Sequence, residues 1–155
     1  MDEAEWISGT EGQVWITYQR GSQLLERVIE QQLRESAGLS HPEFEILSRL
    51  AATPEHRLRM GALAALLISP KTRLNYQVNQ LVARGLVTRE PHPTDRRGLN
   101  TVITPEGLRV FSLAVPGLVE TVRSHVFGIL SPRERSSLHA IMTRIADNID
   151  PTICL

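Results

Sequence analysis

The stretch from Ser69 to Thr104 limits the possible folds of this chain more than any other part of it. It predicts a helix that starts at a Ser-Pro turn, stops at Gly85 and is followed by a short hairpin. Proline favours the first turn of a helix and glycine its end, which sets both boundaries. A helix and a hairpin loop are thereby presented side by side. A nucleic-acid duplex, with a major groove beside a minor groove, has the shape that fits such a pair.

The predicted helix has one apolar stripe and one polar face. The stripe, expected to be buried, consists of Leu74, Val78, Leu81 and Val82. Ser69 is expected as the N-cap and Pro70 as the first helical residue. Acids are absent from 56 to 89, whereas a plain solvated face usually carries glutamate and lysine. Asn and Gln read adenine edges and Arg reads guanine, which favours a major-groove contact through Pro70, Lys71, Thr72, Arg73, Asn75, Tyr76, Asn79 and Gln80.

The hairpin is predicted from strands at 87–90 and 99–103 around a loop at 91–97. Two prolines stiffen the loop and keep it from pairing. Asp95 beside two arginines is placed to fix the direction of one of them, and narrow minor grooves attract an inserted arginine. The expected contacts of this wing are Arg89, His92, Asp95, Arg96 and Arg97.

The charge distribution agrees with this interpretation, although the net charge is zero. Residues 1–50 hold nine acids and four bases, whereas residues 57–97 hold eight bases and two acids. A basic region on an otherwise neutral protein is typical of a DNA-binding face.

Helices are expected on both sides of this stretch. The first covers 11–36 and ends near Gly38, and a second starts at Ser40 with Glu43 as its capping-box partner. A token strand at 58–60 and a short helix at 61–67, with Gly61 as N-cap, precede Ser69. A long apolar helix from Thr104 to about Leu130, kinked at Pro116, and a last helix capped by Ser131 and Glu134 complete the chain.

The apolar face of the first helix is wider than one neighbouring helix needs. It is either core or a contact with another subunit. The same alternatives hold for the short apolar tail after Asp150, which is either frayed or packed against a partner.

Several classes of function are disfavoured. No run of 18 apolar residues and no secretory signal occurs, so we expect a cytoplasmic protein without a membrane span. The single cysteine, Cys154, cannot form an internal disulfide. No phosphate-binding loop, nucleophile elbow or Cys-x-x-Cys appears, and the histidines lack metal-ligand spacing. We therefore expect no enzyme, no cofactor and no metal.

Four segments resemble the MarR family of bacterial transcriptional regulators. They are Asp95-Arg96-Arg97-Gly98, Ile103-Thr104-Pro105-Glu106-Gly107, Ala83-Arg84-Gly85-Leu86-Val87 and Leu39-Ser40-His41-Pro42-Glu43-Phe44. The resemblance covers about residues 11–148. It implies a mainly α winged helix–turn–helix with a small antiparallel β wing. The chain would be one domain (1–155), with a DNA-binding lobe at approximately 40–104 and dimerisation helices at 11–36 and 105–150.

The resemblance also implies a function. A homodimer would place its recognition helices in successive major grooves of a near-palindromic site on double-stranded DNA. Arg97 would enter the minor groove, oriented by Asp95. The family's small phenolic or lipophilic effectors suggest a pocket, for which the candidates are Trp15, Tyr18, His41, Phe44 and Phe111; ordinary packing is the competing explanation for each. The oxidation-sensing branch uses a cysteine near the N-terminus, which this chain lacks.

Taken together, these observations favour a sequence-specific transcriptional regulator, expected to be a repressor that a ligand releases from DNA. The alternative is a winged-helix module that binds a protein or a small molecule without DNA. The basic balance of residues 57–97 argues against that alternative.

Overall fold

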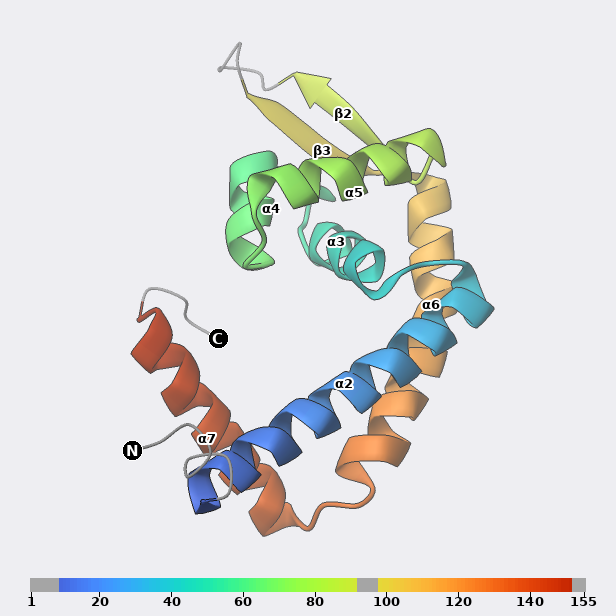
Figure 1. Cartoon of the computed structure of the whole chain (residues 1–155). Coiled ribbons are helices and arrows are strands. Elements are labelled where there is room, and N and C mark those ends of the chain that lie inside the picture. The colour runs from blue at the N-terminus through green and yellow to red at the C-terminus, as the bar shows by residue number, and fades with distance from the viewer. Residues whose placement is uncertain (1–8, 92–97, 152–155) are drawn as a thin grey trace. The chain divides into compact units, whose positions relative to one another are not determined.

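The computed structural model describes residues 9–91 and 98–151 (Figure 1). The chain divides into two compact units, one up to Leu118 and one from Val119. The elements are α2 (Thr10–Ala37), α3 (His41–Ala51), β1 (Arg57–Arg59), α4 (Met60–Leu66), α5 (Lys71–Ala83), β2 (Val87–Pro91), β3 (Leu99–Ile103), α6 (Pro105–Val122), the π-helix η1 (Arg123–Phe127) and α7 (Pro132–Ile149). The expected mainly helical class with a small antiparallel sheet is confirmed.

Helix α2 ends where the sequence predicts. Gly38 adopts a left-handed φ of 65°, and its N–H donates to the carbonyl of Arg34 while that of Leu39 donates to Leu33. The left-handed residue satisfies the last carbonyls of the helix. The buried side chains of α2 are Ile29 and Leu33, near its C-terminus, whereas its N-terminal half exposes Val14, Trp15, Ile16, Tyr18 and Leu24.

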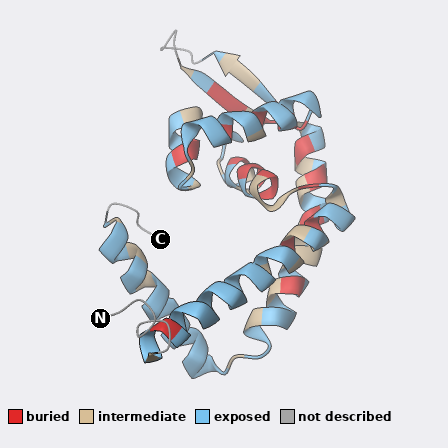
Figure 2. Cartoon of the chain, in the orientation of Figure 1, coloured by how far each residue is buried: buried red, intermediate tan, exposed pale blue. Residues whose placement is uncertain are grey.

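Helix α3 forms the centre of the first unit. The expected capping box is confirmed: Ser40 Oγ accepts from the N–H of Glu43, and the Glu43 carboxylate accepts from the N–H of Ser40 at 2.8 Å. Each bond satisfies a donor that the helix itself leaves unpaired. Figure 2 shows buried residues gathered in α3, and these include Phe44, Ile46, Leu47 and Leu50.

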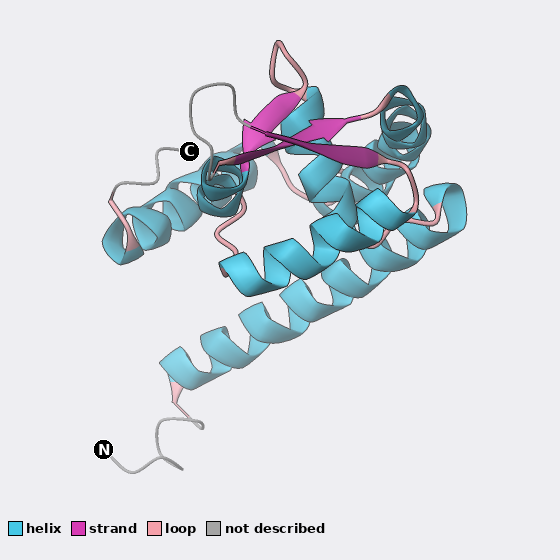
Figure 3. Cartoon of the chain, turned by 90° about the horizontal axis from the view of Figure 1, so that it is seen from above, coloured by secondary structure: helices cyan, strands magenta, loops and turns pink. Residues whose placement is uncertain are grey.

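The sheet has three strands in the order β1-β3-β2, all antiparallel (Figure 3). The token strand is therefore a full sheet member. Its pairing holds Arg59 opposite Asn100 in an extended conformation, so α4 begins at the next residue, Met60. The prediction that Gly61 caps α4 was wrong, because Arg59 occupies that position.

The start of α5 also differs from the prediction. Ser69 is not the N-cap; Pro70 is, and no side chain caps the helix. Pro70 is itself extended, with a ψ of 136°, so the helix begins one residue later. Before it, Ile68 adopts a positive φ of 48° and the N–H of Ser69 donates to Ala64 at 3.1 Å. Ser69 thus closes α4 instead of opening α5. Val82, expected to be buried, is exposed.

Strand β2 follows the predicted stop at Gly85, whose φ is 69°. It extends one residue further than expected and includes Pro91. Beyond β3, Thr104 Oγ1 accepts from the N–H of Gly107 at 3.0 Å and lies 2.8 Å from the carbonyl of Gly85, to which it donates. One hydroxyl thereby caps α6 and ties it to the end of α5.

Helix α6 is shorter than predicted. It runs without interruption through Pro116 but ends at Val122 rather than near Leu130. The next residues form η1, where the N–H of Gly128 donates to Arg123 five residues back. The change of winding therefore falls after Val122 and not at the proline.

Helix α7 in the second unit starts with the expected capping box of Ser131 and Glu134. Hydrogen bonds from Ser131 lower the pKa of the Glu134 carboxyl. None of its residues is buried, as the colours of Figure 2 show. Its exposed apolar side chains follow a helical stripe, formed by Leu138, Ile141, Met142, Ile145 and Ile149.

Neither a membrane span nor a metal cluster stands out in the described ranges. No single helix there is long and apolar enough to cross a membrane, although α6 with η1 and α7 would pass as a bent pair on length and composition. Residues 9–91 and 98–151 contain no group of three or more His, Cys, Asp or Glu side chains arranged to hold a metal ion.

Candidate nucleic-acid interface

The outer face of α5 is open to a partner. All eight residues predicted for this face are exposed, whereas Leu74, Val78 and Leu81 are fully buried. The first turn contains no acid, and no side chain accepts from its N–H groups. Free N–H groups at the positive end of the helix dipole favour an anion such as a phosphate. The face is therefore suited to a negatively charged partner.

Residues of this face point in three directions, because successive side chains turn by about 100° around a helix. Thr72 and Asn79 lie on the outer ridge, opposite the buried stripe. Arg73 and Gln80 lie on one flank, and Asn75 lies on the other. Each flank of α5 has a different neighbour.

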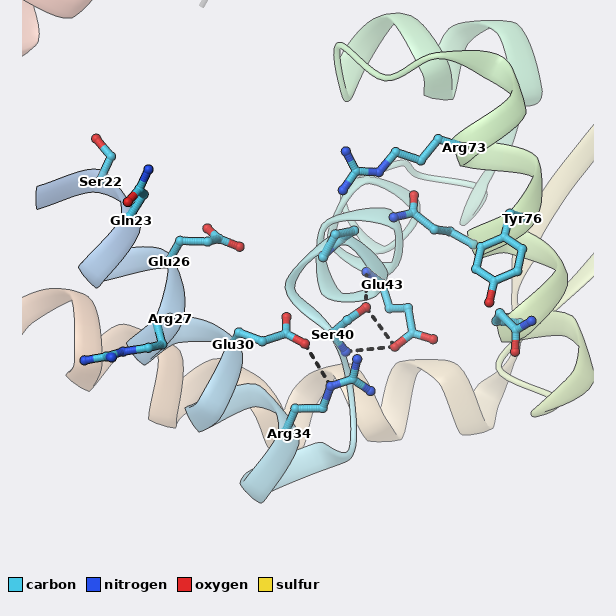
Figure 4. Close-up of a pocket in the computed structure, with 13 residues that line it drawn as sticks. Ser22, Gln23, Glu26, Arg27, Glu30, Arg34, Ser40, Glu43, Arg73 and Tyr76 are labelled. Atoms are coloured by element: carbon cyan, nitrogen blue, oxygen red, sulfur yellow. Dashed lines mark hydrogen bonds and ion pairs between the residues drawn. The ribbon is translucent and has the colours of Figure 1, made fainter. Parts of the chain in front are cut away.

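One flank borders a pocket of about 1030 Å³ between α2, the start of α3 and α5 (Figure 4). In Figure 4, Arg73 extends from α5 toward α2, and Glu26 extends from α2 toward α5. The residues that line it are mostly of polar types and carry both signs of charge, although aliphatic stems and a ring supply much of the exposed surface: Ser22, Gln23, Glu26, Arg27, Glu30, Arg34, Ser40, Pro42, Glu43, Arg73, Tyr76, Gln77 and Gln80. A molecule in this pocket would touch the recognition helix and α2 together.

Hydrogen bonds fix the base of the pocket. Buried Glu43 accepts from Ser40 and also from Arg84 Nη1 at 3.2 Å, which joins α3 to the end of α5. Glu30 accepts from the N–H of His41 at 2.6 Å, which joins α2 to α3. The three helices around the pocket are thus linked by charge-assisted bonds, which are stronger than neutral ones.

The other flank of α5 contacts the sheet. Arg89 Nη2 on β2 donates to Asn75 Oδ1 at 3.2 Å. Arg89 is half-buried, and its Nε is buried without a hydrogen-bond partner among the described residues. Farther along the sheet, Arg57 lies 3.6 Å from Glu90 and 3.4 Å from Glu55. Arg89 therefore faces the recognition helix rather than an acid of the sheet.

Most of the predicted wing contacts cannot be placed. His92, Asp95, Arg96 and Arg97 lie outside the described residues. Of the wing set, Arg89 alone belongs to a described strand. The groove contacts assigned to the four others stay predictions.

The five residues predicted for an effector pocket are found in pairs or with other partners. Trp15 and Tyr18 stack on each other along α2, with ring centroids 5.8 Å apart. Phe44 and Phe111 pack together at 5.2 Å. His41 Nδ1 lies 2.8 Å from Glu26. None of the five lines the 1030 Å³ pocket.

Sequence reasoning assigned none of the residues that line this pocket to an effector site, although it named Arg73, Tyr76 and Gln80 for DNA contact. Gln77 and Gln80 of α5 line the same pocket as Glu26 and Glu30 of α2, although about fifty positions of sequence separate them. No local pattern marks such pairs, because the polar residues of α2 have the spacing of an ordinary solvated face. The Glu-x-x-x-Glu spacing at 26 and 30 was visible, but nothing in it distinguished a pocket wall from a surface.

Comparisons with known proteins agree with this architecture. Residues 37–98 match the model of the MarR family. Sco3205, a MarR family transcriptional regulator from Streptomyces coelicolor solved in complex with DNA, is 37% identical, with a TM-score of 0.90 over 95% of this chain and 96% of its own. AbsC, of the same family and organism, is 32% identical, with a TM-score of 0.89 over 95% and 99%. The transcriptional regulator HosA of Escherichia coli O111:H- is 27% identical over 73% of this chain and 82% of its own.

Proposed function

The chain belongs to the MarR family of transcriptional regulators, and from this membership we propose that it is a DNA-binding repressor that acts as a homodimer. Its two copies of α5 enter successive major grooves of a near-palindromic operator, about one helical turn apart. One observation carries the proposal: the exposed face of α5 lacks acids, begins with free N–H groups and carries Lys71 and Arg73.

Two kinds of contact bind the DNA, one to the phosphates and one to the bases. The first turn of α5 approaches the phosphate backbone, because its N–H groups and basic side chains favour anions. Thr72 and Asn79, on the outer ridge, reach the base edges. Arg97 enters the minor groove beside this site, oriented by Asp95, as the family resemblance implies.

The replacement of Arg97 by alanine tests the proposal. We expect the free energy of operator binding to weaken by about 1–3 kcal/mol, because one inserted arginine is lost from a narrow groove. The affinity of wild type should also fall steeply between about 50 and 200 mM salt, as for any protein that neutralises several phosphates. Fluorescence anisotropy with duplexes taken from the DNA upstream of the gene for this protein measures both the loss of affinity and its salt dependence.

Arg133→Ala provides the matched control, since it removes one exposed arginine from α7, outside the DNA-binding lobe. Its operator affinity should stay close to that of wild type. The alternative of a winged-helix module without DNA predicts no salt-dependent binding of any duplex by the wild-type protein.

The pocket beside α5 supplies the ligand response. An effector bound there contacts α2 and α5 at once and shifts the protein toward the arrangement that it binds better. The lining combines charged groups, among them Arg27 and Arg73, with apolar surface that includes the ring of Tyr76. A phenolic acid, which has a carboxylate for arginine and a ring for tyrosine, matches this chemistry better than a purely lipophilic molecule.

Arg27→Ala separates the effector from DNA binding, because Arg27 lines the pocket from α2 and not from α5. We expect calorimetry with 4-hydroxybenzoate to show about tenfold weaker binding than wild type, since one charge-assisted hydrogen bond is lost. Operator affinity without ligand should be unchanged. Arg20→Ala, on the same helix outside the pocket, is the control; equal ligand binding by Arg27→Ala and wild type would contradict this location.

A further inference from the structure

The hydrogen bond between Arg89 and Asn75 links the wing to the recognition helix. It runs from Nη2 on β2 to Oδ1 on α5, over 3.2 Å. Arg89 is half-buried between these elements, whereas Asn75 is exposed on the face that meets DNA in the proposed function. The bond therefore acts on an exposed side chain of the helix that enters the major groove in the proposed function.

The chemistry of the pair fixes the orientation of the amide. A guanidinium has five donors and no acceptor, so only the oxygen of Asn75 can face it. The amide is planar, and its amino group therefore points away from Arg89. Asn75 therefore keeps its amino group and the second lone pair of its oxygen for a further contact.

Orientation decides which base an asparagine can read. Adenine is read by an amide that accepts from N6 and donates to N7 at the same time. An amide oxygen has two lone pairs, so an oxygen held by Arg89 can still accept from N6 while the amino group donates to N7. Guanine instead offers two acceptors, O6 and N7, on its major-groove edge, and the oxygen of the held amide finds no donor there.

We propose that Arg89 is a positioning residue that holds the Asn75 amide in one orientation through its oxygen, so that Asn75 prefers adenine to guanine. The assignment rests on the proposed function, because it requires α5 to lie in a major groove. Arg89 itself contacts no base. This differs from the contact with DNA that the sequence predicts for Arg89 as a member of the wing.

The charge of Arg89 is a competing explanation for any effect of its loss. A phosphate contact would change the affinity for all sequences by the same factor. A positioning role changes the base preference at one position. The two are separated by selection from a duplex library randomised over the operator, followed by affinity measurements on the selected sequences.

Wild type should select adenine over guanine by about tenfold at one position of each half-site. Arg89→Ala should still select duplexes, but with this preference lost or shifted to guanine because the amide is free to turn. Arg57→Ala removes a charge of the same kind from β1 and should leave the preference as in wild type. Circular dichroism checks that each variant is folded.

A double-mutant cycle supplies the second readout. In the Asn75→Ala background, Arg89→Ala should have no further effect on discrimination at this position, since neighbouring residues that act as a unit are not additive. Additive effects would overturn the assignment, as would uniform weakening by Arg89→Ala with an unchanged base preference. A wild-type protein that selects no duplex would instead overturn the proposed function itself.

Discussion

Aspartate in place of both Ile141 and Ile145 should leave a monomer that binds operator DNA at least about 100-fold more weakly than wild type. The two side chains lie one turn apart on α7 and are 52% and 47% exposed. They belong to the apolar stripe of that helix, and a contiguous apolar surface of this kind marks a site of association. Two charges in a desolvated interface are costly without partners.

The loss of affinity follows from the second half-site. A dimer binds its second half-site at a high effective concentration, which raises overall affinity by about 10²–10⁴ over one half-site alone. A monomer loses this gain in affinity, although its α5 is unchanged. Analytical ultracentrifugation gives the oligomeric state, and a titration of the same sample gives the affinity.

Ala140→Asp is the matched control. It places one aspartate at the residue before Ile141. This position is exposed and lies on the side of α7 opposite the apolar stripe. This variant should remain a dimer with nearly wild-type affinity. If the Ile141 and Ile145 variant stayed dimeric, α7 would not form the interface.

Gly107→Ala should lower the free energy of unfolding by about 3 kcal/mol, at the upper end of the range for overpacking. A Cβ at Gly107 would lie 2.1 Å from the carbonyl oxygen of Leu86 and 2.8 Å from Ile103 Cγ1. The nearer atom belongs to the backbone and cannot rotate away. The helix start must therefore move, which also strains the bonds of Thr104 to Gly85 and to Gly107.

Gly21→Ala is the control for this substitution. Gly21 lies in the middle of α2, and a Cβ there meets no atom within 4 Å. Because glycine loses more backbone entropy than alanine in a helix, this change should instead stabilise the fold by roughly 0.5–1 kcal/mol. Urea denaturation of both variants at one protein concentration gives the two values. Equal stability of Gly107→Ala and wild type would mean that α6 does not start against Leu86.

Local chemistry explains which parts of the fold could be predicted. Ser40 with Glu43 and Ser131 with Glu134 satisfy helix starts within four residues, and Gly38 and Gly85 end helices in the left-handed region. These signals can be recognised without knowing which distant residues pack against the helix. The prediction at Ser69 failed because Pro70 is itself extended, with a ψ of 136°, so the helix begins one residue later than the Ser-Pro pattern suggests.

The candidate site was predicted in one respect and missed in another. The exposed face of α5 followed from periodicity and from the absence of acids. Its neighbours did not, because Asn75 meets Arg89 and Arg84 meets Glu43 through tertiary contacts. The aromatic residues chosen for an effector pocket illustrate the same limit: Phe44 and Phe111 pack on each other, a pairing that apolar composition alone does not predict.

The two flanks of α5 have different neighbours, and this difference limits how the DNA specificity of the helix can evolve. A substitution at Asn75 alters the partner of Arg89, and one at Arg73 or Gln80 alters a pocket wall, so each carries a second effect. Thr72 and Asn79 face outward from the buried stripe and do not line the 1030 Å³ pocket. Substitutions at these two positions are therefore expected to be the first to change the preferred operator sequence. Substitutions at the other positions are expected only together with changes in the residues that they contact.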